Sequence, residues 1–197
     1  MSSVTPFGRL TGPLRLYVAP STEAIPDLDA APAGNWVELG ETDGDQTVDW
    51  VGSLTGFSDN DATGMRKHVR DTEGLTVTAT LVNLTLEHRA RVFSMTSGAV
   101  TTTTSGALAV KELAHRRGYC PTRYSLLLRG GVLNGEDDSP YGAWPGQRYV
   151  PLGVFDGEPS EVRSKGGSPG LEFIFTAEWD DTAAAGREFG YMQVQSS

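Results

Sequence analysis

The stretch Gly74–Gly98, GLTVTATLVNLTLEHRARVFSMTSG, decides the fold class of this chain. In its first half, apolar residues alternate with threonines from Leu75 to Leu81. A period of two with β-branched residues is typical of a strand that has one apolar and one polar face. The stretch therefore predicts a half-buried strand at its beginning.

The second half of the same stretch changes from a strand pattern to a helix pattern. Leu86, Ala90 and Phe93 are spaced so that they lie on one stripe of a helix. Asn83 is a favourable residue for the helix N-cap position. We therefore expect one short amphipathic helix at about 84–96, directly after the strand, and no other convincing helix elsewhere.

Outward from this stretch, the composition favours strands and turns. Glycine (24) and proline (11) are frequent, and valine- and threonine-rich runs alternate with them. Residues 171–179, LEFIFTAEW, alternate in the same way as the first strand. Asp43-Gly44, Ser105-Gly106 and Asp156-Gly157 each predict the turn of a β-hairpin.

These elements predict a mainly β protein with one flanking helix. The fold class that we expect is a β-sandwich or a partly closed barrel. No change in composition marks a domain boundary, so residues 1–197 are interpreted as a single domain. Two long loops are expected, at about 52–66 and 130–146, because both stretches are rich in glycine and polar residues.

Charge and cysteine content limit the possible functions. The net charge is −9, the sequence pI is about 4.8 and there are only three lysines, which argues against tight binding to the phosphates of nucleic acids. A single cysteine, Cys120, excludes an intrachain disulfide and fits synthesis in a reducing compartment. We expect no membrane contact and no secretory signal, because no apolar run of sufficient length is present.

Motifs for catalysis or metal binding are weak throughout. The three histidines are far apart in sequence and form no zinc-ligand spacing. Residues 59–64, DNDATG, begin like a calcium-binding loop, but Arg70 stands where the bidentate acid belongs. Neither a nucleophile elbow nor a phosphate-binding loop is present. We therefore predict no enzyme activity, no catalytic or metal-binding residue and no cofactor.

Four segments together resemble the major tail (tail tube) proteins of long-tailed, siphovirus-type bacteriophages, particularly those of actinobacterial hosts. The segments are GPLRLYVAPSTEAIPDL at 12–28, NWVELGETDGD at 35–45, the threonine-rich strand that runs into LTLEHRARVF at 84–93, and LEFIFTAEWDD at 171–181. The resemblance spans nearly the whole chain, although none of these motifs is as specific as a nucleotide or metal signature.

The resemblance implies a structural virion protein. In that family, a β-sandwich with a flanking helix assembles into six-membered rings, and the rings stack into a hollow tube through which DNA passes without tight binding. The implied partners are further copies of the chain, the tape measure protein, and the tail terminator and distal tail proteins. The implied location is the phage tail, after synthesis in the cytoplasm of the host.

The resemblance also assigns roles to individual residues. The loop at 52–66 matches in position the family's long loop that reaches the adjoining ring, which makes Leu54, Phe57 and Met65 the candidate inter-ring contacts. An acidic bore repels DNA over about a Debye length, roughly 10 Å at ordinary salt. Glu172 and Glu178 are the candidate lumen-facing acids, because both fall on the polar side of the strand at 171–179.

Several alternatives stay open at this point. The chain could form the tube of a related injection or secretion machine, or it could be another virion component, such as a capsid decoration or distal tail protein. A carbohydrate-binding β-sandwich is a further alternative, in which Tyr141 and Trp144 would stack on sugar rings. A hydrolase that uses paired carboxylates has the least support, since no specific pair is nominated.

Overall fold

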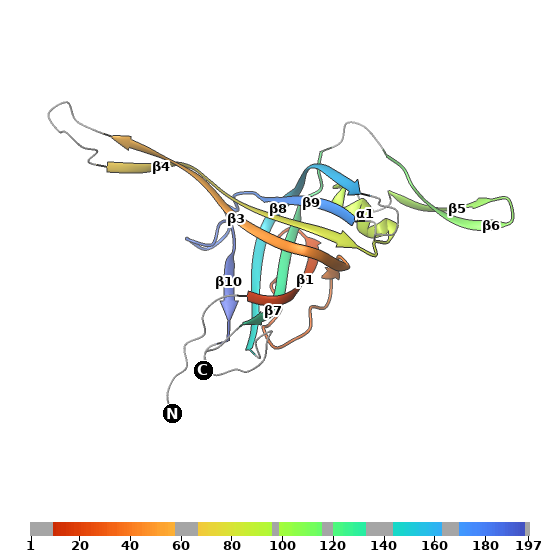
Figure 1. Ribbon diagram of the computed structural model, residues 1–197, viewed down its shortest axis with the longest axis horizontal. Helices are drawn as coiled ribbons and strands as arrows, with labels where there is room; N and C mark the ends of the chain where they lie inside the picture. Colours follow the sequence, from red (N-terminus) through yellow and green to blue (C-terminus); the bar gives the residue numbers. More distant parts are fainter. Residues whose placement is uncertain are drawn as a thin grey trace.

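A computed structural model describes residues 10–57, 67–95, 99–115, 120–132, 144–162 and 170–195. This part of the chain is mainly β, with antiparallel strands and one helix (Figure 1). The strands are β1 (Leu10–Pro20), β2 (Val37–Glu38), β3 (Glu41–Phe57), β4 (Lys67–Val82), β5 (Val100–Ser105), β6 (Leu108–Leu113), β7 (Tyr124–Val132), β8 (Trp144–Val162), β9 (Gly170–Ala177) and β10 (Tyr191–Val194). The helix α1 (Leu86–Val92) follows β4. The predicted mainly β fold with one helix is confirmed.

Eight strands form one sheet in the order β2-β1-β7-β8-β9-β4-β3, with β10 paired to β8, and β5 and β6 form a separate two-stranded sheet. The large sheet does not close into a barrel, because β2 and β3 are its two ends. Near these ends, the Leu39 amide donates to the Leu16 carbonyl at 2.9 Å, and the Gln46 side chain donates to the Leu14 carbonyl at 3.0 Å. The sheet thus curls strongly but remains open.

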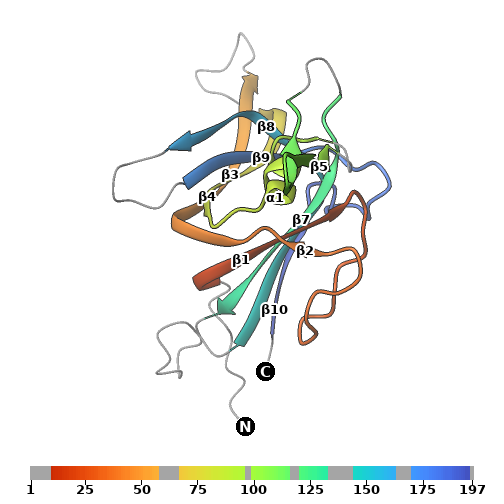
Figure 2. The same ribbon diagram turned by 90° about the vertical axis from the view of Figure 1, so that its right-hand side faces the viewer.

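Strand β8 belongs to both halves of the curled sheet. Its first part pairs with β7 and β10, whereas its last part pairs with β9. The change occurs at Gly153, where a Cβ atom would lie 2.5 Å from the Phe175 ring and 2.6 Å from the Thr176 carbonyl oxygen. Only glycine allows this close approach. Figure 2 shows that the half with β1, β7 and β10 runs obliquely to the half with β3 and β9, which is the arrangement of a sandwich-like fold.

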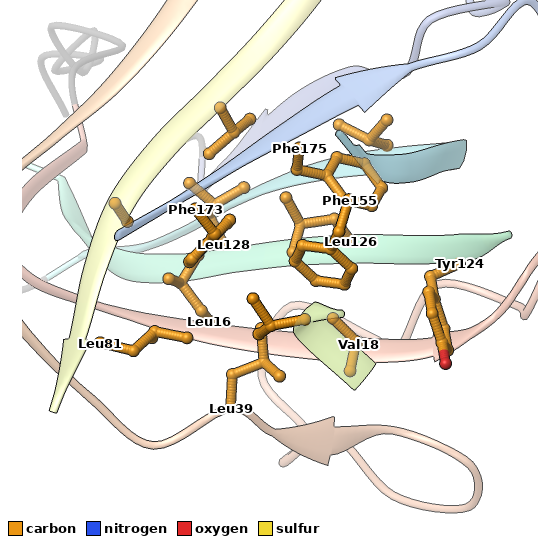
Figure 3. Close-up of a cluster of buried hydrophobic side chains, with 14 of the residues drawn as sticks. Leu16, Val18, Leu39, Leu81, Tyr124, Leu126, Leu128, Phe155, Phe173 and Phe175 are labelled. Atoms are coloured by element: carbon orange, nitrogen blue, oxygen red, sulfur yellow. The ribbon is translucent and has the colours of Figure 1, made fainter. Parts of the chain in front are cut away.

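The main core fills the concave side of this curled sheet (Figure 3). Phe155 packs edge-to-face against Phe173 at 5.2 Å and against Phe175 at 5.1 Å between ring centroids. The buried cluster consists of Leu16, Val18, Leu39, Leu75, Val77, Ala79, Leu81, Val92, Tyr124, Leu126, Leu128, Val150, Phe155, Leu171, Phe173, Phe175 and Ala177. The alternation predicted for 75–81 and 171–177 is confirmed, since every second residue of both runs is buried.

A second apolar cluster lies on the other face of the sheet. Trp36 packs edge-to-face on Tyr149, at 6.2 Å between ring centroids. The segment 21–36 covers this cluster and is held by side-chain donors. The Trp36 indole donates to the Ala24 carbonyl at 3.0 Å, and the Tyr149 hydroxyl donates to the Glu23 carbonyl at 2.7 Å. Burial raises the pKa of Tyr149, so the hydroxyl keeps its proton for this bond.

The helix is shorter than the predicted span of 84–96. Its N-cap is Thr85, whose hydroxyl accepts from the His88 amide at 3.2 Å, whereas Asn83 turns the chain in a left-handed conformation (φ 56°). The helix ends at Val92, because Ser94 also adopts a left-handed conformation (φ 52°) and its hydroxyl donates to the Phe155 carbonyl at 3.1 Å. Tertiary bonding to β8 therefore replaces the predicted last turn.

Two of the three predicted hairpin turns are wrong. Gly44 has a φ of 74° but belongs to a bulge inside β3, where pairing with β4 shifts between Asp43 and Thr47. Asp156-Gly157 lies inside the continuous strand β8, where pairing with β9 is irregular. The turn at Ser105-Gly106 is confirmed as the connection of β5 and β6.

The two predicted long loops are also shorter than expected. Residues 52–57 of the first predicted loop belong to β3. The remaining residues of that prediction, 58–66, lie outside the described residues. Residues 130–132 end β7 and residues 144–146 begin β8. Residues 52–57 pair with β4, and residues 130–132 of β7 pair with residues 144–146 of β8, so strand pairing extends into both predicted loops.

Candidate functional site

The hairpin of β3 and β4 extends beyond the body of the protein as a long arm (Figure 1). We define the arm as residues 51–57 and 67–73. Every described side chain of the arm is exposed, and cross-strand bonds such as that between the Ser53 and Thr72 hydroxyls (2.8 Å) join the two strands. The arm and its root expose four large apolar side chains, namely Trp50, Val51, Leu54 and Val69.

The three predicted inter-ring residues have different positions. Leu54 lies on the arm with 62% of its surface exposed. Phe57 is the last residue of β3, and Met65 lies outside the described residues. Sequence reasoning missed Trp50 and Val69, because both were assigned to strands whose position outside the body could not be known.

The outer face of the half-sheet formed by β8, β9, β4 and β3 is acidic. Its centre consists of threonines on β4, and exposed carboxylates surround them. The exposed acids on this face are Asp43, Asp49, Asp156 and Glu172. The body segments of these strands, 43–50, 75–82, 153–162 and 170–177, contain no lysine or arginine. The described segments of this face therefore carry negative charge without a cation of their own.

The two predicted lumen-facing acids lie in different environments. Glu172 stands exposed on the acidic face, beside Thr80 across the strand pair. Glu178 follows the end of β9, and its carboxylate forms an ion pair with Arg123 at 2.6 Å. The structure thus does not bring the two together as free acids. The acids at 43 and 156 were missed because their Asp-Gly dipeptides were interpreted as hairpin turns.

The second projecting element is the hairpin of β5 and β6, on the opposite side of the molecule from the arm (Figure 1). Its base is fixed to α1 by an ion pair between Lys111 and Glu87 and by edge-to-face packing of His115 on Phe93. That ion pair also lowers the pKa of the Glu87 carboxyl. Residues 101–110, TTTTSGALAV, contain no charge, and only Val110 among them is half-buried. Leu108 is 69% exposed.

An aromatic patch lies at the root of the arm. We define it as Trp50, Phe189 and Trp179. The Phe189 ring packs edge-to-face against Trp50 at 5.8 Å and against Trp179 at 5.6 Å. Both tryptophans remain more than half exposed, at 53% and 58%. Phe189 thus packs against one part of each tryptophan ring, and the rest of each ring is exposed.

A cleft of about 620 Å³ lies between α1, the end of β1 and the segment 34–37. Its charged lining residues are Glu87, which is paired with Lys111, Arg123, which is paired with Glu178, and Arg91. The one carboxylate among them is already engaged, and an arginine does not act as a base. We therefore do not place the function in this cleft.

The metal-binding possibilities are limited in the same way. In the segments that the structure describes, no three His, Cys, Asp or Glu side chains come close enough to hold a metal ion. The calcium-like residues 59–64 lie outside those segments. The three histidines stand on separate elements: His68 on the arm, His88 on α1 and His115 after β6.

The described residues also contain no helix that is long and apolar enough to cross a membrane. Comparison with known proteins gives no further assignment. No family model matches the chain, and no curated protein matches it significantly.

Proposed function

We propose that this chain is the structural subunit of a hollow tube, the tail tube of a long-tailed bacteriophage. Copies associate into six-membered rings, the rings stack, and DNA passes through the bore. The observation that carries the proposal is the arm, a long two-stranded extension whose exposed apolar residues have no partner within the described part of the subunit. The resemblance of the sequence to tail tube proteins supplies the kind of assembly, and with it the location in the virion.

The arm fits a contact between rings. A two-stranded ribbon is only marginally stable alone in water. The arm exposes apolar residues on both of its faces, Val51 and Val69 on one and Leu54 on the other, and such residues mark surfaces that are covered in the functional state. We assign the contact with the adjoining ring to Leu54 and Phe57 of β3, and by sequence position to Met65, which lies outside the described residues.

The acidic face fits the wall of the bore. Its four exposed acids, with threonines between them, present hydroxyls and carboxylates to a passing duplex. Like charges repel over about 10 Å at ordinary salt, so phosphates are kept from adhering to the wall. Glu172 belongs to this wall with Asp49 and Asp156. Glu178 is left out, because Arg123 neutralises it.

Open sheet edges fit the closure of a ring. Strand β3 ends the large sheet and pairs only with β4, so its other edge can accept a neighbour. Head-to-tail contacts between different edges close into a ring when the rotation allows, and closure removes the exposed edges. The resemblance adds the tape measure, tail terminator and distal tail proteins as further partners of the tube.

Negative-stain electron microscopy of the concentrated, purified protein tests the proposal. We expect rings or hollow filaments, and a protein that stays monomeric at every concentration contradicts it. Leu54→Asp is expected to leave rings but prevent stacking, because it places a charge in the inter-ring contact. Ser53→Asp is the matched control, since it adds the same charge at a neighbouring position that is already polar and exposed.

One observation favours a second candidate, a carbohydrate-binding module. Trp50 and Trp179 are exposed aromatic rings, the side chains that stack on sugars. Of the residues first considered for this role, Trp144 is half-buried at the start of β8 and Tyr141 lies outside the described residues. A positive sugar-array screen with a monomeric protein would favour this candidate over the tube.

A further inference from the structure

The two projecting hairpins are protected from association to different degrees. Natural proteins guard exposed strand edges with charged side chains or proline. The arm has such guards, including Arg70, Asp71 and Glu73. Residues 101–110 of the β5–β6 hairpin have none, although nine of these ten residues are exposed. An exposed two-stranded ribbon without charged residues is only marginally stable alone and is prone to associate with another chain.

The hairpin also has one face suited to packing. Leu108 and Val110 on β6 point to the same side as Thr103 and Ser105 on β5, because these residues are paired across the strands. The opposite face includes Lys111, which is held by Glu87 on α1. The face with Leu108 is therefore the one that remains available to a partner.

The aromatic patch is the complementary surface. It includes Trp50 at the root of the arm, and the arm leaves the body on the opposite side from β5 and β6 (Figure 1). The open edge of β3 begins at the same place, because Trp50 is itself a β3 residue. If the hairpin of a second copy docks there, its Leu108 packs against the aromatic rings and its backbone pairs with the free edge of β3.

We propose that the β5–β6 hairpin of one copy docks on the aromatic patch of a second copy, with Leu108 against Trp50 and Trp179. This inference rests on the proposed self-assembly and specifies one of its contacts. The surfaces lie on opposite sides of the same molecule, so the contact is heterologous and repeats from copy to copy. Residues 101–110 of the hairpin are uncharged, so docking buries no unpaired ion from this segment.

Charge substitutions test the docking face. Leu108→Lys is expected to raise the protein concentration needed for assembly by at least about tenfold, because an apolar side chain is lost from the contact and a charge is added. Ala109→Lys is the matched control. It adds the same charge one residue away on the opposite face, and we expect a change of less than about twofold. Unchanged circular dichroism shows that both variants are folded.

Cross-linking identifies the surface that receives the hairpin. In a Cys120→Ser background, Leu108→Cys protein is mixed with Trp179→Cys protein and treated with a short bismaleimide. We expect a mixed cross-linked dimer from this pair and none when Ile174→Cys, on the acidic face, replaces Trp179→Cys. Cross-links chiefly between two Leu108→Cys chains, or chiefly to Ile174→Cys, would overturn the inference.

The outcomes separate the inference from the proposed function. If the wild type forms rings or filaments and Leu108→Lys does so at the same concentration, the hairpin contact is wrong and the tube proposal stands. If the wild type remains monomeric at every concentration, both are overturned.

Discussion

The arm and the β5–β6 hairpin are both two-stranded ribbons that leave the body, but they differ in charge. The arm alternates apolar residues with charged ones, for example Val69 beside Arg70, and Arg70 forms an ion pair with Glu73 at 3.0 Å. The hairpin tip is uncharged from 101 to 110. Charged side chains keep an exposed strand from pairing with another chain, so the arm carries a protection against association that the hairpin lacks.

The largest expected effect comes from a substitution in the large sheet, from which both ribbons project. Gly153→Val places atoms where the Phe175 ring and the Thr176 carbonyl already lie, and it should lower the free energy of unfolding by about 3 kcal/mol or more. Chemical denaturation measures this change. Gly74→Ala, at the root of the arm, is the control. A Cβ there meets only the Val51 carbonyl at 4.0 Å, so we expect a change below about 1 kcal/mol.

The next prediction adds a charge to the hairpin and removes charges from the arm. Thr103→Lys gives the hairpin a charge, and we expect assembly to need at least about tenfold more protein, with unfolding free energy unchanged within about 0.5 kcal/mol. Arg70→Thr combined with Glu73→Thr removes an ion pair from the arm without leaving a lone charge. We expect this variant to aggregate non-specifically, measured as turbidity. If the first variant assembled normally and the second stayed clear, the contrast between the ribbons would have no consequence.

A smaller effect separates Glu172 on β9 from Glu178 just after β9. Glu172→Lys places a cation on the acidic face, so assembled protein should gain salt-dependent affinity for duplex DNA, measured by fluorescence anisotropy, with little change in stability. Glu178→Lys instead sets two cations side by side and should cost about 0.5–1 kcal/mol of stability without a gain in DNA affinity. Similar behaviour of the two variants would contradict the assignment of only Glu172 to the bore.

The smallest expected effect concerns His88 on α1, whose ring lies beside the segment between β2 and β3. Burial, assisted by nearby Arg91 and opposed by Glu87 and Glu38, lowers the pKa of His88. The unfolded chain therefore binds a proton at a higher pH than the folded protein does. Stability from this group is present above the unfolded pKa of about 6.5 and is lost as the pH falls below it. Denaturation between pH 7 and 5 should show a decrease that His88→Gln reduces.

Local patterns in the sequence predicted the elements that are decided locally. The alternation at 75–81 and 171–177 gave two core strands, and Ser105-Gly106 gave a true hairpin. Asp43-Gly44 and Asp156-Gly157 have the same turn chemistry but lie inside strands, because pairing with β4 and β9 continues past them. A dipeptide cannot report whether a distant strand offers such a partner.

The candidate site depended on information that the sequence does not carry. The acids of the outer face come from β3, β8 and β9, and only the strand order brings them together. The aromatic patch joins Trp50 to Trp179 through Phe189, and these residues are far apart in the chain. One signal was readable in advance, namely the absence of charge over 101–110.

Strand β4 runs without interruption from the arm to the residues before α1, and α1 leads directly to the β5–β6 hairpin. Its 16 residues span about 50 Å at roughly 3.3 Å per residue. Its backbone bonds to β3 and β9 lie across this axis, so a pull along β4 loads them in shear and many must give way together. A pull on the arm along β4 would therefore be resisted by many backbone bonds at once, as far as the residues before α1.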